Sequence, residues 1–204
     1  MRAEIISIGD ELTSGQRLDT NSQWLAERLG ELGVVVMFHT TVADDLAANV
    51  LVFRQACERA DLVIASGGLG PTADDLTRQA IAQMAGVDLV QDDPSLAHIQ
   101  AMFPRGARPI FNPHGTAPGI DFTCVGAGGK SARIFAVPGV PAEMKEMWEE
   151  TVRPEIQTMQ AATGTKKVIV HHRIKCFGVG ESDLEAMLPD TQSHRVQRLA
   201  RLLP

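Results

Sequence analysis

Aromatic residues are scarce in this chain of 204 residues: it has no tyrosine, and aromatic side chains make up only 4% of it. Basic residues are also in the minority, with 19 Lys and Arg against 25 Asp and Glu and a formal net charge of -6 at pH 7. Nucleic-acid binding needs clustered cations for the phosphates, and single strands need aromatic platforms for stacking. The composition therefore argues against a nucleic-acid partner.

Cysteines and long apolar runs are equally limited. The three cysteines, Cys57, Cys124 and Cys176, lie far apart and form no C-x-x-C pair. A scattered, odd-numbered set is typical of reduced thiols in the cytoplasm and not of a disulfide framework. No apolar run approaches the roughly 20 residues that span a bilayer, and Glu4 and Asp10 would interrupt the apolar region of a signal peptide. We therefore expect a cytoplasmic protein with no membrane partner.

What the chain does contain is an alternation of short apolar runs and helical patterns. The apolar runs at 3–8, 34–38 and 61–66 are each followed by a segment whose apolar residues repeat at helical spacing. This alternation is typical of a parallel sheet covered by helices on both faces. Further strands are expected at 122–125 and 133–137, with a helix after them. The sequence thus predicts an α/β fold.

Glycine-rich loops follow the ends of the expected strands, where ligands bind in parallel α/β sheets. The strongest signal is the loop at 66–77, which reads Ser-Gly-Gly-Leu-Gly-Pro-Thr-Ala-Asp-Asp-Leu-Thr. Its glycines allow close approach of a ligand, and the following helix N-terminus favours an anion. The loop is neither a Walker A sequence nor G-x-G-x-x-G, so it indicates a phosphorylated small molecule without identifying it. The structural alternative is a helix cap, formed by Thr72 with Asp75 three residues later.

Other loops supply further candidates. The loop at 9–21 brings Asp10 and Glu11 to the end of the first strand, and Thr20 or Asn21 is the expected cap of the next helix. The proline- and glycine-rich segment 104–119 is expected to be a loop. It contains His114, a residue type that in such a turn is more often solvated than functional.

Three acids each follow a different expected strand: Glu11, Asp44 and Asp75. If they converge on one crevice, their oxygens suit Mg²⁺ or Mn²⁺, which proteins often hold jointly with ligand phosphates. Zn²⁺ is disfavoured because the sequence has no Cys/His cluster. The three acids are therefore candidate metal ligands.

The motifs at 67–77 and 137–141, with those at 1–21, 112–119 and around Asp44, resemble the N-terminal domain of the CinA family of competence/damage-inducible proteins. That domain belongs to the wider molybdopterin-binding group of MoaB, MogA, MoeA and gephyrin. The resemblance implies a three-layer α/β/α sandwich with a mostly parallel sheet, the MogA-like fold. It also implies a homo-oligomer, commonly a trimer.

The resemblance further implies an activity, because CinA-type domains are associated with divalent-metal-dependent hydrolysis of ADP-ribose to AMP and ribose 5-phosphate. On this hypothesis Asp75, Asp44 and Glu11 are the catalytic residues and the ligands of Mg²⁺, Mn²⁺ or Co²⁺. The expected substrate-binding residues, all in the motifs above, are Gly9, Asp10, Asn21, Gly67, Gly68, Gly70, Pro71, Thr72, Asp74, Thr116, Pro138 and Gly139. The alternative is a protein that binds a phosphorylated pterin, or takes part in molybdenum-cofactor assembly, without hydrolysis.

Two domains are expected from the same resemblance. Residues 1–165 correspond to the molybdopterin-binding-like nucleotide domain, and 166–204 to the truncated start of a KH-type linker domain plus a tail. The segment 178–188 resembles the opening of that linker but lacks the G-x-x-G clamp, so RNA binding is not expected. Between 97 and 104 the chain is shorter than the family pattern, in a segment that usually contributes to the substrate crevice.

Overall fold

The computed structural model of the chain describes residues 1–91, 102–126, 129–163 and 178. The chain divides into two units, Met1–Ile169 and Val170–Pro204, and every described helix and strand belongs to the first. The expected second domain, 166–204, lies outside the described residues except for Gly178. Its boundary therefore stays a prediction.

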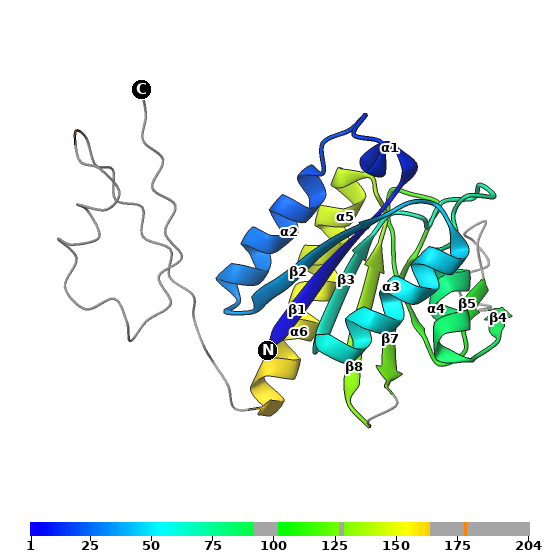
Figure 1. Ribbon diagram of the computed structural model, residues 1–204. Helices are drawn as coiled ribbons and strands as arrows, with labels where there is room; N and C mark the ends of the chain where they lie inside the picture. The colour runs from blue at the N-terminus through cyan, green and yellow to red at the C-terminus, as the bar shows by residue number, and fades with distance from the viewer. Residues whose placement is uncertain (92–101, 127–128, 164–177, 179–204) are drawn as a thin grey trace. The chain divides into compact units, whose positions relative to one another are not determined.

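A six-stranded sheet in the order β2-β1-β3-β8-β7-β6 forms the central layer (Figure 1). Its parallel part consists of β1 (Arg2–Ile8), β2 (Val35–Val42), β3 (Leu62–Ser66) and β8 (Ser131–Val137). Two strands continue it in antiparallel fashion, β7 (Gly119–Val125) and β6 (Arg108–Ile110). The expected mostly parallel sheet is thus confirmed.

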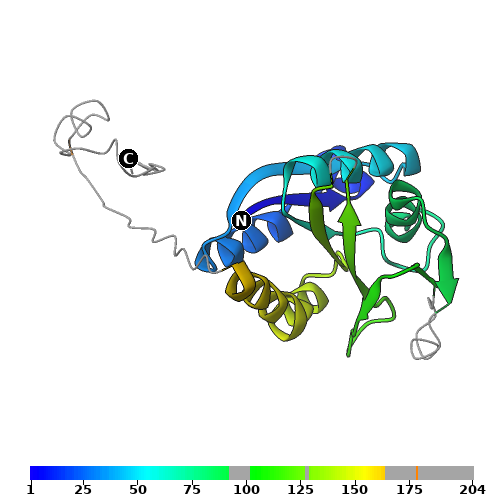
Figure 2. The ribbon, with the colours of Figure 1, turned by 90° about the horizontal axis from the view of Figure 1, so that it is seen from below.

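Helices cover both faces of this sheet, as Figures 1 and 2 show. One face carries α2 (Thr20–Glu31), α5 (Pro141–Met147), the π-helical turn η2 (Trp148–Val152) and α6 (Arg153–Thr163). The other face carries α3 (Leu46–Arg59) and α4 (Thr77–Ala85). The short helix α1 (Asp10–Thr13) follows β1, and a separate antiparallel pair consists of β4 (Leu89–Gln91) and β5 (Met102–Pro104). The fold is the expected three-layer α/β/α sandwich.

The strand side chains alternate between the two layers because successive residues of a strand point to opposite faces. On β1, Ile5 packs into the core with α2 and α5, whereas Ile6 packs into the core with α3 and α4. On β3, Ile64 and Val63 divide in the same way. Strands buried on both faces read as continuous apolar runs, which is why the sequence pattern identified them.

Among the described residues, two carboxylates are buried on strands of this sheet, Glu4 on β1 and Asp121 on β7. Glu4 on β1 has a fully buried side chain that accepts hydrogen bonds from Arg59 Nε at 2.7 Å and Arg59 Nη2 at 2.6 Å. The Thr40 hydroxyl donates to the same carboxylate at 2.7 Å. The charge of Glu4 is therefore paired, as burial requires.

Residues 104–119 are not the continuous loop that the sequence predicts. Arg108–Ile110 forms β6, which pairs with β7 at the edge of the sheet. Proline has no backbone N–H to donate, and an edge strand tolerates this because one of its sides pairs with no other strand. Pro109 is therefore compatible with β6. In the part of the chain that the structure describes, no helix is long and apolar enough to cross a membrane.

Candidate functional site

A crevice of about 390 Å³ lies where β1, β3 and β8 end. It is lined by the loops that follow these strands, by the Asp44 turn and by the segment around Thr116. All the expected site residues line it except Asp10 and Asn21: they are Gly9, Glu11, Asp44, Gly67, Gly68, Gly70, Pro71, Thr72, Asp74, Asp75, Thr116, Pro138 and Gly139. The fold thus gathers motifs that are far apart in the sequence, although their roles stay predictions.

The glycine-rich loop enters this crevice in a conformation that needs glycine. Gly67 has φ 108°, and a Cβ there would lie 2.3 Å from the Ile8 carbonyl oxygen. Its N–H donates to the Val137 carbonyl at 3.1 Å, which ties the loop to the end of β8. The following N–H groups of Gly68, Leu69 and Gly70 have no acceptor among the described residues. Unpaired backbone donors on such a loop are the groups that bind phosphate oxygens.

Two buried side chains of α4 hold this loop in place. The Thr77 hydroxyl donates to the Gly67 carbonyl at 2.8 Å, and Arg78 Nη2 donates to the Leu69 carbonyl at 2.8 Å. Burial lowers the pKa of Arg78 to about 10, against the opposing attraction of Asp75. The role of Arg78 was not predicted, because a basic residue on a helix normally indicates a solvated face.

The expected helix cap formed by Thr72 and Asp75 is wrong in position, because α4 begins only at Thr77. The pair instead closes a turn inside the loop. Asp75 Oδ2 accepts from the Thr72 N–H at 2.9 Å and from the Thr72 hydroxyl at 2.6 Å, and the Asp75 N–H donates to the Thr72 carbonyl at 3.2 Å. Asp75 therefore has a structural role in shaping the loop.

The other acids are linked across two loops. The Asp10 N–H donates to Asp44 Oδ2 at 3.0 Å, and the Asp44 N–H donates to Asp10 Oδ1 at 3.1 Å. Burial raises the pKa of Asp44, as does the negative charge of Asp10, Glu11 and Asp75, although the Asp10 N–H opposes the rise. The acids of the crevice are thus close enough to repel one another.

Their arrangement does not form a cation site as it stands. Among the described residues, no three His, Cys, Asp or Glu side chains are grouped so that they could hold a metal ion. Asp44 and Asp75 each accept a backbone N–H through Oδ2, which leaves the other carboxylate oxygen of each residue as a potential ligand. A divalent metal held by Glu11, Asp44 and Asp75 therefore stays a prediction, and it requires these side chains to move.

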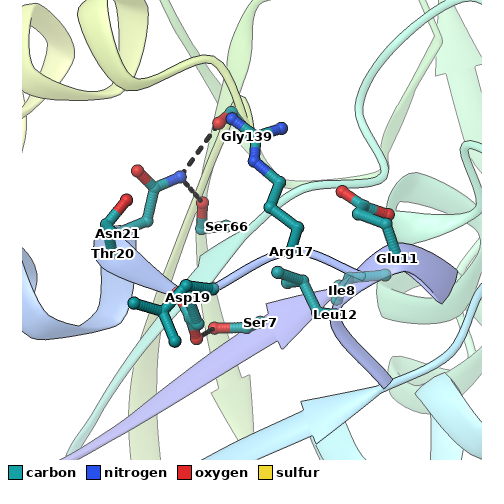
Figure 3. Close-up of a pocket in the computed structure, with 11 residues that line it drawn as sticks. Ser7, Ile8, Glu11, Leu12, Arg17, Asp19, Thr20, Asn21, Ser66 and Gly139 are labelled. Atoms are coloured by element: carbon teal, nitrogen blue, oxygen red, sulfur yellow. Dashed lines mark hydrogen bonds between the residues drawn. The ribbon is translucent and has the colours of Figure 1, made fainter. Parts of the chain in front are cut away.

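A smaller cavity of about 30 Å³ adjoins the crevice (Figure 3). Asn21 lines it and uses Nδ2 as a brace, donating to Ser66 Oγ at 3.1 Å and to the Gly139 carbonyl at 2.9 Å. Asn21 thereby joins the start of α2 to the ends of β3 and β8, and it lies outside the larger crevice. A cavity of this size holds one or two water molecules at most, so it is too small for a ring system.

The cap of α2 is Asp19, and neither Thr20 nor Asn21 as expected. Asp19 Oδ1 accepts from the Ser22 N–H at 2.9 Å, and Asp19 Oδ2 accepts from the Ser7 hydroxyl at 2.5 Å. Burial acts to raise the pKa of Asp19, but the hydrogen bonds from Ser7 and Ser22 prevail and lower it. Asp19 is therefore held as a carboxylate at the edge of the small cavity.

Two charged residues of the crevice were missed by the sequence analysis. Glu143, on α5, lines the crevice and accepts from Asn112 Nδ2 at 2.7 Å. Arg17 lines both the crevice and the small cavity. Glu143 stands two residues after the 137–141 motif, which could have indicated it. Arg17 lies within the 9–21 loop, where only the acids and the expected helix caps were candidates. His114 has a largely exposed side chain, with Nε2 at 3.3 Å from Glu146 Oε2, as expected for a solvated turn residue.

Known proteins share both the sequence motifs and this fold. The family described as "Probable molybdopterin binding domain" matches residues 4–158. The solved structure of the CinA protein from Thermoplasma acidophilum is 36% identical, with a TM-score of 0.68, and the match covers 75% of this chain and 96% of that one. The chain belongs to the CinA-like branch of the molybdopterin-binding domain family.

Relatives of full length extend beyond this CinA-like chain. CinA-like proteins of Frankia casuarinae and Chlorobium luteolum are 39% and 38% identical and are matched by 99% and 94% of this chain, but over only 49% and 47% of their own length. The chain thus spans about half the length of these curated relatives. The MoaB structure from Thermus thermophilus, with a TM-score of 0.58 and 20% identity over 81% of this chain and 99% of that one, shares the fold. The MogA-like fold is therefore confirmed.

Proposed function

We propose that the crevice binds a phosphorylated pterin-type ligand of the molybdopterin class. The observation that carries this proposal is the glycine-rich loop, whose N–H groups at Gly68, Leu69 and Gly70 have no acceptor among the described residues. Unpaired backbone donors after a strand and before a helix suit a phosphate group. The family description, a probable molybdopterin binding domain, supports a pterin as the remainder of the ligand.

The acids of the crevice suit the other part of such a ligand. A reduced pterin ring carries several N–H donors, and carboxylates accept such hydrogen bonds strongly. Asp74 and Glu143 line the crevice, and Asp74 makes no hydrogen bond within the described part of the chain. Binding therefore needs no metal ion and no movement of Asp44 or Asp75. This favours the non-hydrolytic alternative over the hydrolase hypothesis.

Equilibrium dialysis of the 204-residue chain against molybdopterin, under anaerobic conditions, tests this proposal. Gly139 is exposed at the crevice and has room for a Cβ, so Gly139→Leu should obstruct the crevice and weaken binding at least tenfold. The matched control is Gly126→Leu, before the amino end of β8, where a Cβ also fits. Absence of binding by the unaltered chain, or equal loss in both variants, would contradict the proposal.

A second candidate is metal-dependent hydrolysis of ADP-ribose to AMP and ribose 5-phosphate. It is favoured by one observation, the repulsion among Asp10, Glu11, Asp44 and Asp75 that contributes to the raised pKa of Asp44, because crowded carboxylates attract cations. Incubation with ADP-ribose and Mn²⁺ or Co²⁺, with AMP release followed by chromatography, tests it. AMP release that depends on the added metal would favour this candidate, and tight molybdopterin binding without AMP release would favour the first. The expected homo-oligomer, a trimer by resemblance, also stays a prediction.

A further inference from the structure

Arg17 differs in charge from every other ionisable side chain in the crevice. The remaining charged residues that line it are all acids: Glu11, Asp44, Asp74, Asp75 and Glu143. Among the described residues Arg17 is therefore the one basic group at this site. It stands where the crevice and the small cavity meet, because Ile8, Glu11, Arg17 and Gly139 line both.

The guanidinium of Arg17 has no partner within the described part of the protein. The backbone N–H of Arg17 donates to the Glu11 carbonyl at 3.0 Å, which fixes the start of the side chain. Its guanidinium forms no ion pair or hydrogen bond there, whereas Arg59 and Arg133 each pair with a carboxylate. In Figure 3 the side chain extends from its loop toward Gly139, and the Glu11 carboxylate lies apart from it. The charge of Arg17 is thus available to a ligand.

We propose that Arg17 binds the phosphate group of the ligand and so fixes which way round the ligand lies. This inference rests on the proposed function and adds an orientation to it. The phosphate would lie where the crevice and the small cavity meet, between Arg17 and the glycine-rich loop. The donor-bearing ring would lie toward Asp74 and Glu143.

Electrostatics favour this orientation over its reverse. A guanidinium offers paired N–H donors that match phosphate oxygens in geometry as well as in charge. A phosphate placed toward Asp74 and Glu143 would face carboxylates without the guanidinium of Arg17 beside it, and like charges at short range repel strongly in a partly enclosed site. The ligand class that fits is therefore asymmetric, with an anion at one end and hydrogen-bond donors at the other.

Calorimetric titration of the 204-residue chain with inorganic pyrophosphate tests the role of Arg17 without any pterin. Arg17→Gln should weaken pyrophosphate binding about tenfold or more, a change of about 1.4 kcal/mol. The matched control is Arg54→Gln on α3, an exposed arginine that lines neither the crevice nor the small cavity and has no ion pair among the described residues. Because both variants alter the net charge equally, only a local role separates them. Binding of pyrophosphate that is equal in both variants, or absent from the unaltered chain, overturns the inference.

A second comparison separates this inference from the proposed function. Molybdopterin carries a phosphate, and 6-hydroxymethylpterin does not. Arg17→Gln should weaken binding of molybdopterin about tenfold and leave binding of 6-hydroxymethylpterin unchanged. Equal weakening of both ligands overturns the orientation. A chain that binds pyrophosphate through Arg17 but does not bind molybdopterin overturns the pterin proposal and leaves the role of Arg17 supported.

Discussion

Replacing Asp75 by asparagine separates a structural role of this acid from a catalytic one. The carboxylate accepts two hydrogen bonds from Thr72, at 2.9 Å from the N–H and 2.6 Å from the hydroxyl. Asp75→Asn keeps the shape of the side chain and one acceptor oxygen but removes the negative charge. The turn should therefore persist with weaker hydrogen bonds.

The expected size of the effect follows from these contacts. A hydrogen bond to a charged group contributes about 1.5–3 kcal/mol and a neutral one about 0.5–1.5 kcal/mol. Two bonds that change from the first kind to the second would lose about 2 kcal/mol, and competition from water at this half-buried site reduces the loss to about 1 kcal/mol. Loss of attraction for Arg78 and relief of repulsion with Asp44 act in opposite directions. We expect the melting temperature to fall by about 2–4 °C.

Thermal melts of the unaltered chain, Asp75→Asn, Thr72→Val and the double variant measure this effect. If Asp75 acts through the Thr72 hydroxyl, the two changes should be less than additive, as for residues in contact. AMP release from ADP-ribose with Mn²⁺ is measured in parallel. Additive effects on the melting temperature would refute a role of Asp75 through the Thr72 hydroxyl. An unchanged melting temperature, with metal-dependent AMP release reduced by orders of magnitude, would make Asp75 catalytic instead.

Two further predictions concern other buried or crowded acids. Arg59→Met should lower the free energy of unfolding by about 3–5 kcal/mol in urea titrations, because it leaves the buried Glu4 carboxylate without its ion pair. The control, Arg54→Met on the same helix, should change the free energy of unfolding by less than about 0.5 kcal/mol. Equal losses in the two variants would contradict this reason. Asp44→Asn should stabilise the protein at pH 7. The free energy of unfolding should rise by up to about 1 kcal/mol, and the melting temperature should rise with it. The pKa of Asp44 is raised in the folded state, so its ionisation costs stability as pH rises through that value. The gain should therefore vanish in melts below about pH 4, and a gain that persists there would contradict this cause.

The layers of the fold were predictable because burial leaves a direct trace in the sequence. Strands β1 and β3 are covered on both faces and so read as unbroken apolar runs at 3–8 and 61–66. Glycines at strand ends indicated where the crevice would form, because close packing there excludes a Cβ. The position of Gly67 against the Ile8 carbonyl shows that exclusion directly.

The polar contacts of the site were not predictable in the same way. Asp19, Thr20 and Asn21 are all plausible helix caps by residue type, and only the backbone path decides that Asp19 accepts from Ser22. The start of α4 was misplaced for a related reason. The Thr72–Asp75 pair has the spacing of a cap, yet it closes a separate turn before the helix. The loop is fixed in this position because Thr77 and Arg78 donate hydrogen bonds to two of its carbonyls. Those bonds join residues whose proximity only the folded chain creates.

The two proposed functions place different demands on the crowded acids of the crevice. Repulsion that contributes to the raised pKa of Asp44 is a cost present in the free protein. In the proposed binding mode the ring would bond to Asp74 and Glu143, which leaves the repulsion at Asp44 in place. A cation would reduce that repulsion, but among the described residues the acids are not grouped to hold one, so their side chains would have to approach one another. Metal-dependent hydrolysis would therefore require a rearrangement of these acids, whereas the proposed pterin binding would not.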